Sequence, residues 1–231
     1  MTGGAKRIGR AIVLALAEAG YDIALHYGQS AEAAERTAGE VESRGRACRL
    51  FQADLADSRA VTALVPAVAA ACHNLKVLVN SASIFGPGRL LETTPDLYAR
   101  HFDVNLRAPL LLARDFARHA ARGVIVNLLD QRITRSDPRH LAYTLTKKAL
   151  AALTEMAARD LAPRVRVCGV CPGPILPPAG KDPSYLDRMA SHVPLGRAGT
   201  PEEVARAVLF LVESEYVTGQ LLFVDGGEHI A

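Results

Sequence analysis

The chain has 231 residues, of which 49% are hydrophobic and 22% are charged. This length and apolar fraction predict one globular domain, residues 1–231, with a substantial core. The formal net charge is +3 and no basic block occurs, which argues against nucleic acid as a partner. We expect a cytoplasmic protein without a membrane partner, because no apolar run could span a bilayer and no signal peptide opens the sequence.

The first ten residues predict a turn that binds phosphate. Glycines precede a helix-period segment that starts near Ile12. Such a turn presents backbone N–H groups and the positive end of a helix dipole to an anion, although a plain helix-capping loop would show the same pattern. Gly3 would allow the tight turn and Gly9 the close approach of a ligand. A strand normally precedes a nucleotide-binding turn. Only Met1 stands before this motif, so we expect the sequence to begin late or to lack its first strand.

Strands and helices alternate along the rest of the chain. The strands are expected at 21–27, 47–52, 76–80, 123–129, 165–171 and 220–224, and the helices at 31–44, 58–71, 96–121, 142–161 and from 201. The helix of 96–121 is expected to be interrupted near Asn105 and Pro109. Residues 174–199 form a Pro- and Gly-punctuated insertion, with a short helix near 185–190, that is long enough to act as a substrate lid. The alternation predicts an α/β fold, in which a doubly wound parallel sheet of the Rossmann type carries helices on both faces.

The segment after the second strand bears on the cofactor. Dinucleotide sites specific for NAD usually carry an acidic residue about 20 residues after the glycine motif, where it bonds the ribose 2′-hydroxyl. No acidic residue occurs at 26–30, whereas Arg7 stands in the glycine loop. A guanidinium in this place could accept a 2′-phosphate. The sequence therefore favours NADPH over NADH as the cofactor.

Three polar residues are expected to converge where the strand of 123–129 meets the helix of 142–161. Asp130 stands at the end of the strand, and Tyr143 and Lys147 are four residues apart, so they share one face of the helix. Open α/β sheets carry their chemistry at such strand ends. A Tyr-x-x-x-Lys pair alone is a weak signal, because an ordinary helix surface would show it too. The alternative for Asp130 is a loop residue that caps backbone N–H groups.

The sequence indicates neither a redox role for the cysteines nor a metal site at the histidines. Cys168 and Cys171 lie three apart in the strand of 165–171, so they point to opposite faces, and we expect buried structural thiols. The seven histidines show no ligand spacing, such as two on one helical turn with an acid between them. We therefore expect no bound metal ion.

Together these motifs resemble those of the short-chain dehydrogenase/reductase family over nearly the whole chain. Residues 2–9 are similar to its Thr-Gly-x-x-x-Gly-x-Gly motif, with Arg7 in place of the middle glycine, and residues 80–83 are similar to its Asn-Asn-Ala-Gly segment. Tyr143 and Lys147 match its signature pair. The resemblance implies a cofactor site made of Gly3, Arg7, Ile8, Gly9, Tyr27, Ser30, Asp54, Leu55, Asn80, Ser81, Ala82, Ser83, Tyr143, Lys147, Pro172 and Gly173.

Within this family the chain is most similar to pteridine reductases and dihydromonapterin reductases. These carry an aspartate where most members have the catalytic serine, as the chain does at Asp130. Phe85 matches the ring that stacks on the pterin in that subfamily. Gly28 and Cys168 depart from the usual pattern, in which basic residues and asparagine stand at these places. The resemblance implies a pteridine substrate that is bound by Ser83, Phe85, Asp130, Tyr143 and Pro174.

The resemblance also implies how the catalytic residues act. Tyr143 would donate a proton as hydride arrives, Lys147 would lower the pKa of the phenol and bond the nicotinamide ribose, and the helix residue Asn105 would hold a water beside Lys147. Asp130 differs from serine, because an ionised carboxylate only accepts hydrogen bonds. It suits a substrate with ring N–H groups or amines, such as a pterin, whereas a simple ketone would meet an unpaired negative charge.

Two other functions are compatible with these motifs. One is a generic carbonyl reductase for sugars, ketones or acyl thioesters, and the other is a catalytically silent NADPH-binding protein. The intact set of Asn105, Tyr143 and Lys147 argues against the silent protein, and Asp130 with Phe85 argues against the generic reductase. Family members form dimers, usually within tetramers, through the helix of 142–161 and the one before it. The wide apolar face of this helix therefore predicts a homotetramer.

Overall fold

The computed structural model describes residues 1–231 except 73, 179–181 and 183. The strands are β1 (Ile23–Tyr27), β2 (Cys48–Gln52), β3 (Val77–Asn80), β4 (Gly123–Leu128), β5 (Val165–Pro172) and β6 (Leu221–Val224). All pairings between them are parallel, with β1 beside β2 and the other four in the order β3–β4–β5–β6. Each expected strand is present, and its first and last residues lie close to the expected ones.

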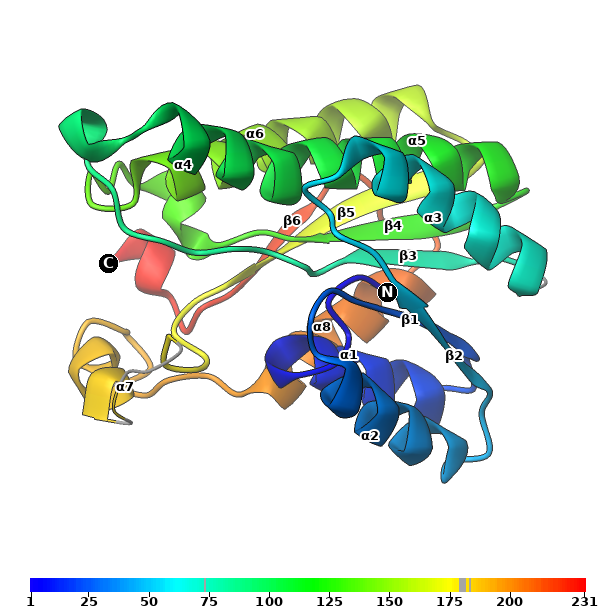
Figure 1. The fold of residues 1–231 in the computed structure, drawn as a ribbon. Helices are drawn as coiled ribbons and strands as arrows, with labels where there is room; N and C mark the ends of the chain where they lie inside the picture. Colours follow the sequence, from blue (N-terminus) through cyan, green and yellow to red (C-terminus); the bar gives the residue numbers. More distant parts are fainter. Residues whose placement is uncertain (73, 179–181, 183) are drawn as a thin grey trace.

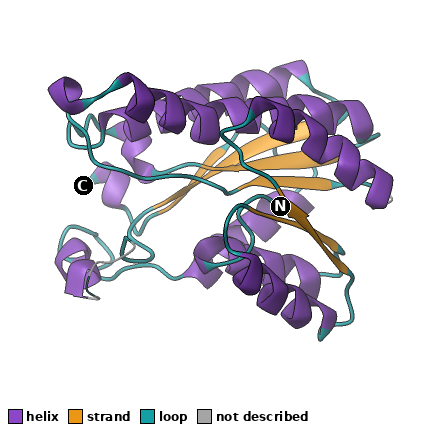
Figure 2. Ribbon diagram, in the orientation of Figure 1, coloured by secondary structure: helices purple, strands orange, loops and turns teal. Residues whose placement is uncertain are grey.

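Helices cover both faces of the strands, as expected for a doubly wound fold (Figure 1 and Figure 2). One face carries α3 (Ser58–Ala71), α4 (Pro95–Phe102), α5 (Ala108–His119) and α6 (Leu141–Asp160), and the other carries α1 (Arg7–Glu18), α2 (Ala31–Glu42) and α8 (Pro201–Glu213). The N-terminus of α8 is set by a capping box between Thr200 and Glu203, which satisfies two backbone N–H groups that have no partner within the helix. The Rossmann-type α/β fold in one domain is confirmed.

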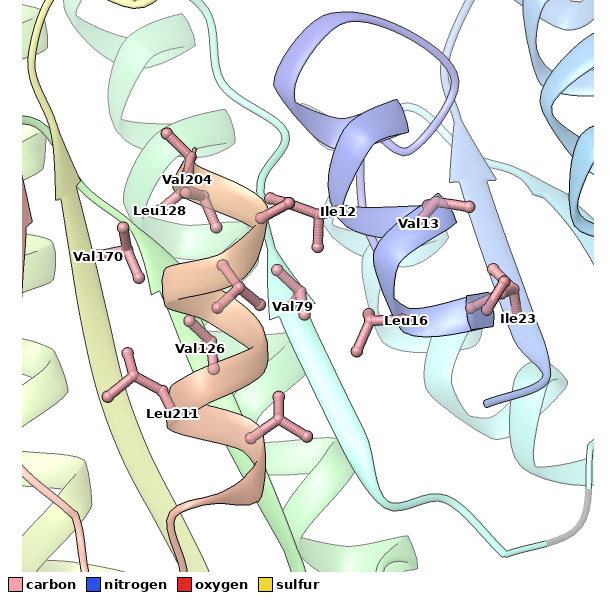
Figure 3. Packing of buried hydrophobic residues seen from close by; sticks show 14 of the residues in the cluster. Ile12, Val13, Leu16, Ile23, Val79, Val126, Leu128, Val170, Val204 and Leu211 are labelled. Atoms are coloured by element: carbon pink, nitrogen blue, oxygen red, sulfur yellow. The ribbon is translucent and has the colours of Figure 1, made fainter. Parts of the chain in front are cut away.

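Apolar side chains alternate between the two faces of the central strands. Val126 of β4 and Val170 of β5 pack toward α8, where they meet Val204 and Leu211 (Figure 3). The neighbouring residue Ile125 points the other way, into the layer beneath α3 and α5. Because both faces are buried, the strands show continuous apolar runs instead of polar alternation.

Cys168 and Cys171 lie on opposite faces of β5, as their spacing predicts. Cys168 packs in the layer beneath α1 and α8, whereas Cys171 packs with Leu129 and Leu150. Both thiols are free and buried. Burial raises the pKa of both, that of Cys171 to about 12, so neither is a thiolate at neutral pH. The expectation of buried structural thiols is confirmed.

A π-helical turn interrupts the helix that was expected at 96–121. α4 ends at Phe102, the π turn spans Asp103–Arg107, and α5 begins at Ala108. Pro109 lies in the first turn of α5, directly after the π turn, and its missing N–H removes one helical donor there. Single π turns are frequent at functional sites. Here the turn directs Asn105 inward, and only 1% of this residue is exposed.

Met1 and Thr2 occupy one end of the space between β1 and β3 (Figure 1). The Thr2 N–H donates to the Val79 carbonyl oxygen, and the Met1 carbonyl oxygen accepts from the His26 N–H, both at 2.9 Å. The two residues therefore join both strands in the parallel direction. Beyond them lies a cavity of about 390 Å³, which we call the strand gap. Its apolar lining includes Leu16, Ile23, Phe51, Leu64, Leu78 and Phe116.

Residues 174–199, the expected lid, carry the short helix α7 (Ser184–Ala190). Residues 179–181 and 183 of this segment lie outside the described residues. At its base the Gly199 N–H donates to the Pro174 carbonyl oxygen (2.9 Å). A lid function for the segment stays a prediction. No helix in the described part of the chain is long and apolar enough to cross a membrane.

Candidate active site

A cavity of about 440 Å³ opens at the carboxyl ends of β1, β3, β4 and β5. Open parallel sheets bind their ligands at this edge. The expected site residues that line it are Gly3, Arg7, Ile8, Gly9, Tyr27, Ser30, Ser81, Ala82, Ser83, Asp130, Tyr143, Lys147, Pro172 and Gly173. The lining residues that were not expected are Ala5, Lys6, Gly28, Leu128 and Leu129.

The glycine loop packs too closely to admit side chains at two positions. A Cβ atom on Gly9 would lie 2.1 Å from the Gly3 carbonyl oxygen, and one on Gly3 would lie 2.9 Å from Ala82 Cα. Arg7, at the start of α1, has a φ of 56°, in the left-handed region that glycine adopts without steric cost. Its Nη2 donates to the Pro177 carbonyl oxygen (2.6 Å). Arg7 therefore adopts a strained backbone at the place where the family motif has glycine.

His26 of β1 forms hydrogen bonds with the glycine loop and with the residue that follows β2. The Gly3 N–H donates to His26 Nδ1 (3.3 Å), and His26 Nε2 lies 3.0 Å from the Ala53 carbonyl oxygen. Both bonds form with a neutral ring that carries its hydrogen on Nε2. Burial lowers the pKa of His26 from 6.5 to about 4, so the ring is neutral at physiological pH.

Acidification is expected to destabilise the protein through His26. Between pH 6.5 and about 4 the unfolded chain binds a proton at this ring and the folded chain does not. The free energy of unfolding therefore falls as the pH decreases through this window, by up to about 3 kcal/mol. Denaturant unfolding at about pH 7 and about pH 4.5 measures the loss. His26→Gln, which keeps a donor and an acceptor, should lose less stability between these two pH values. An equal loss in both proteins would contradict the assignment.

Asp130 and Tyr143 are in direct contact at the end of β4. The Tyr143 hydroxyl donates to Asp130 Oδ2 (2.7 Å), and Asp130 Oδ1 accepts the Arg132 backbone N–H (2.8 Å). One carboxylate oxygen thus caps the loop, as one interpretation of the sequence expects. The other accepts from the phenol, as the expected convergence with Tyr143 requires. Burial, and then the charge of Asp130, raises the pKa of Tyr143 well above its ordinary value. The phenol is a protonated hydrogen-bond donor.

Lys147 lies on the same face of α6 as Tyr143 and is buried. Its Nζ donates to the Leu128 carbonyl oxygen (2.7 Å) and lies 5.7 Å from the centre of the Tyr143 ring. Burial lowers the pKa of Lys147 to about 8. Burial and the nearer Asp130 charge both stabilise the neutral phenol and raise the pKa of Tyr143. The expected lowering of this pKa by Lys147 together with the oxidised nicotinamide stays a prediction.

Asn105 holds the loop that follows β3. Its Oδ1 accepts from the Ile84 N–H (2.9 Å) and the Ser83 hydroxyl (3.2 Å). Its Nδ2 donates to the Ile84 carbonyl oxygen (2.9 Å) and to Thr146 Oγ1 (3.3 Å). These four bonds use the donors and acceptors of the amide. Asn105 therefore couples the π turn, α6 and the loop that brings Ser83 to the cavity. Its expected water beside Lys147 stays a prediction.

Phe85 forms an aromatic wall beside Tyr143. The two ring centroids are 4.7 Å apart in edge-to-face geometry. His140 stacks on Phe85 with a centroid distance of 4.5 Å, and the guanidinium carbon of Arg132 lies 5.2 Å from the ring centre. Phe85 is 42% exposed, so part of the ring stays accessible to a ligand. Its expected stacking on the substrate stays a prediction, and His140 already occupies one face.

Four other expected site residues lie outside the cavity lining. Asp54 is exposed after β2 and caps its own loop. Leu55 is buried in the core, and Asn80 donates from Nδ2 to Asn127 Oδ1 (2.9 Å) inside the protein. Pro174 lies at the base of the expected lid. The structure gives Leu55 and Asn80 packing roles, and the ligand contacts of all four stay predictions.

Lys6 is a candidate ligand contact that the motif comparison did not indicate. It is the exposed N-cap residue of α1 and lines the cavity. The sequence feature that could have indicated Lys6 is its position as a cation beside the first turn of the helix after the glycine loop. Among the described residues, no group of three or more His, Cys, Asp or Glu side chains is placed to hold a metal ion.

Known reductases are similar to this chain over nearly its whole length. A family model described as enoyl-(acyl carrier protein) reductase matches residues 3–229. The 3-oxoacyl-[acyl-carrier-protein] reductase FabG of Staphylococcus aureus is 32% identical over 238 residues, which cover 100% of this chain and 97% of that protein. Versicolorin reductase stcU of Emericella nidulans is also 32% identical, over 98% of this chain and 93% of that protein.

Solved structures are similar over the whole chain. FolM alternative dihydrofolate reductase 1 from Brucella canis, complexed with NADP, has a TM-score of 0.93 at 37% identity and covers 100% of this chain and 93% of its own. A short-chain dehydrogenase from Burkholderia cenocepacia, in complex with NADP, has a TM-score of 0.93 at 36% identity, with coverages of 100% and 96%. The chain belongs to the short-chain dehydrogenase/reductase family, and it is an oxidoreductase.

Proposed function

We propose that this enzyme reduces a pteridine with NADPH as the hydride donor. The observation that carries the proposal is the 2.7 Å hydrogen bond from Tyr143 to Asp130, next to the ring of Phe85. A carboxylate in this position accepts hydrogen bonds from a substrate, and an aromatic wall suits a flat ring. The likeness to alternative dihydrofolate reductases from two Brucella species supports the same substrate class.

The residues of the active-site cavity fit a phosphorylated dinucleotide. Gly3 and Gly9 allow the loop to pack closely on itself and on Ala82, and α1 directs the positive end of its dipole toward the cavity that both glycines line. Lys6 and Arg7 add two cations that could hold the 2′-phosphate. Lys147 would hold the ribose hydroxyls. When bound, NADPH supplies the hydride for the reduction.

Arg7 is expected to make NADPH bind more tightly than NADH. Arg7→Gly removes the guanidinium and relieves the positive φ, so it should weaken NADPH binding by roughly 5- to 30-fold while NADH binding and the fold are retained. Titration of both nucleotides by fluorescence measures the change. Arg10→Gln is the matched control, because Arg10 follows on the same helix and pairs with Glu40. Equal affinities for both nucleotides in the unmodified protein would contradict the prediction.

Asp130 determines which substrates can use the Tyr143 proton. The phenol donates to Asp130, and its raised pKa keeps it protonated. A ring N–H or amino group of a pterin would donate to Asp130 instead, which releases the Tyr143 hydroxyl to protonate the reduced ring nitrogen. A ketone offers no such donor, so its reduction would take the phenol from Asp130 and leave the carboxylate without a partner. The arrangement favours a substrate with donors beside its reducible bond.

Substrate turnover tests the proposal directly. NADPH oxidation is followed by absorbance with dihydropterins, dihydrofolate, dihydrobiopterin and simple ketones. A kcat/KM for at least one pteridine well above that for the ketones supports the proposal. Turnover of ketones alone would favour the generic carbonyl reductase, and NADPH binding without turnover of any substrate would favour the silent protein.

A generic carbonyl reductase is the second candidate. The similarity to the FabG reductase of Staphylococcus aureus and to versicolorin reductase favours it. Its carbonyl substrate would accept the Tyr143 proton in the same way. The presence of Asp130 weighs against it, because a carboxylate repels the developing alkoxide oxygen. An acyl thioester added to the substrate panel tests this candidate.

We also propose that the protein forms a homotetramer. Leu110 of α5 is 43% exposed, and Leu145 and Met156 of α6 are 43% and 71% exposed. Leu150, which was expected on the same face, is buried in the core, so the outward apolar face is narrower than predicted. Light scattering at micromolar concentration should give four times the chain mass, and Leu145→Asp should reduce it. A monomeric mass for the unmodified protein would contradict the proposal.

The expected location and partners are kept as proposals. Four free cysteines are typical of a protein in a reducing compartment such as the cytoplasm. A small molecule is the proposed substrate, and neither nucleic acid nor membrane is proposed as a partner. Fractionation of cells that contain a tagged chain tests the location.

A further inference from the structure

A second cavity, of about 460 Å³, adjoins the candidate active site. It lies between the loop that follows β4, the loop before α4, the helix α7 and the residues near the C-terminus. We call it the basic cavity. Its charged lining residues are Arg89, Arg132, Arg135, Arg139, Asp137 and Glu228. Four guanidinium groups thus line the same space as two carboxyl groups.

Two of the arginines are paired inside the basic cavity. Arg139 contacts Asp137 through two bonds, of 3.0 and 3.3 Å. Arg135 lies 3.8 Å from the Glu228 carboxylate and also donates to the backbone carbonyl of Glu228. Glu228 is 3% exposed, and burial raises its pKa, which weakens it as a counter-charge. These pairs hold the walls of the cavity in place.

The other two arginines have no counter-charge within the basic cavity. Arg132 lies 3.9 Å from Asp130 Oδ2, but that oxygen lies outside the cavity and already accepts from Tyr143. Arg89 is exposed, and its backbone N–H donates to Glu92 Oε2 (2.9 Å), but its guanidinium forms no ion pair in the part of the chain that the structure describes. Guanidinium groups stay protonated at any physiological pH. The cavity therefore carries an excess of positive charge.

The basic cavity and the active site are lined by consecutive residues of one loop, although none of the described residues lines both. Asp130 lines the active-site cavity, and the next residues along the chain, Gln131 and Arg132, line the basic cavity. The guanidinium of Arg132 lies over the ring of Phe85 (5.2 Å), whose edge meets Tyr143 (4.7 Å). A substituent on a ring that is held at Tyr143 and Asp130 would pass Phe85 and Arg132 and enter the basic cavity.

We infer that the substrate carries an anionic group, a carboxylate or a phosphate, which binds in the basic cavity. This inference rests on the proposed function and specifies it further: the pteridine has an anionic tail. Arginine suits this task, because its planar fork of donors binds carboxylate or phosphate in a bidentate way. Arg89 supplies the unpaired charge, and Arg132 lies between the ring site and the tail site.

Arg89→Gln tests the inference. Arg89 is exposed and lines only the basic cavity, so the substitution should leave the fold and the chemical step intact. KM and kcat are measured with dihydrofolate, which carries carboxylates, with dihydroneopterin phosphate, and with dihydrobiopterin, which carries no anionic group. KM for an anionic pterin should rise about 5- to 10-fold, while both constants for dihydrobiopterin stay unchanged. Arg89→Glu should raise the same KM further.

Arg122→Gln is the matched control, because Arg122 is also an exposed arginine, at the opposite end of β4. It should change none of the constants. A rise confined to dihydrofolate identifies a carboxylate as the bound group, and a rise confined to the phosphate ester identifies a phosphate. Equal changes for neutral and anionic pterins, or no change at all, would overturn the inference.

The basic cavity can also be tested apart from the proposed function. If no pterin is reduced, the proposed function fails, and calorimetry with p-aminobenzoylglutamate then measures binding of an anionic tail without the pterin ring. Binding to the unmodified protein that weakens in Arg89→Gln would retain the basic cavity as an anion site. No binding to the unmodified protein, or equal binding to both proteins, would overturn the inference.

Discussion

Replacing Asp130 with serine is expected to lower kcat/KM for a dihydropterin by roughly 30- to 1,000-fold. Asp130 Oδ2 is the atom that accepts from the Tyr143 hydroxyl, and in the proposed complex it accepts from the substrate ring. Loss of one charge-assisted bond in a water-poor site costs about 2–4 kcal/mol. The serine hydroxyl can donate to a carbonyl oxygen, which a carboxylate cannot do. Activity on a simple ketone should therefore survive or rise in Asp130→Ser.

Tyr143→Phe is the control for this experiment. It removes the hydroxyl and retains the buried ring beside Phe85, so the packing of the site is kept. Both activities should disappear while NADPH binding, followed by fluorescence, stays nearly unchanged. Steady-state kinetics of both variants on one dihydropterin and one ketone separate the two functions. If Asp130→Ser left pterin turnover unchanged, Asp130 would serve only as the cap of the Arg132 N–H, and the generic reductase would explain the site better.

The elements that carry this site could be predicted because their patterns are local. The apolar run before Asp130 and the helical pattern that starts near Ala142 are each longer than the few residues by which a predicted element boundary can be wrong. The four-residue spacing then places Tyr143 and Lys147 on one face of α6 whatever the tertiary structure. The position of Asp130 at the strand end was sufficient to expect it near Tyr143, and the two side chains are in contact.

The contacts that depend on three-dimensional surroundings could not be predicted in this way. The sequence suggests Lys147 as the charge that acts on Tyr143, but in the fold Lys147 bonds to the Leu128 carbonyl oxygen and Asp130 is the nearer charge. Arg89 and Glu228 are far apart in the sequence and line one cavity. No periodicity or short motif links such residues, because their proximity follows from how α4, α7 and the C-terminus pack.

An apolar strand added before Met1 is expected to raise the unfolding temperature of this chain by roughly 5–15 °C. β1 pairs with β2 and β3 pairs with β4, so the opposite edges of β1 and β3 face the strand gap. The Met1 amino group donates to the Ala24 carbonyl oxygen (3.0 Å), and burial lowers its pKa to about 6. Residues joined to this nitrogen would run along both edges, and an amide would replace a buried amino group.

The expected rise in the unfolding temperature follows from two opposing contributions to the free energy, side-chain burial and conformational entropy. Each fully buried Val or Ile side chain contributes about 1.5–3 kcal/mol, and ordering each residue costs about 1–2 kcal/mol. Four such residues and one alanine, with their backbone hydrogen bonds, should therefore add about 2–5 kcal/mol to the free energy of unfolding. Calorimetry compares the extension Val-Ala-Val-Ile-Val with a Gly-Ser extension of equal length, which is too polar to occupy the apolar cavity. Equal unfolding temperatures for the two extensions would show that the strand gap does not accept a strand.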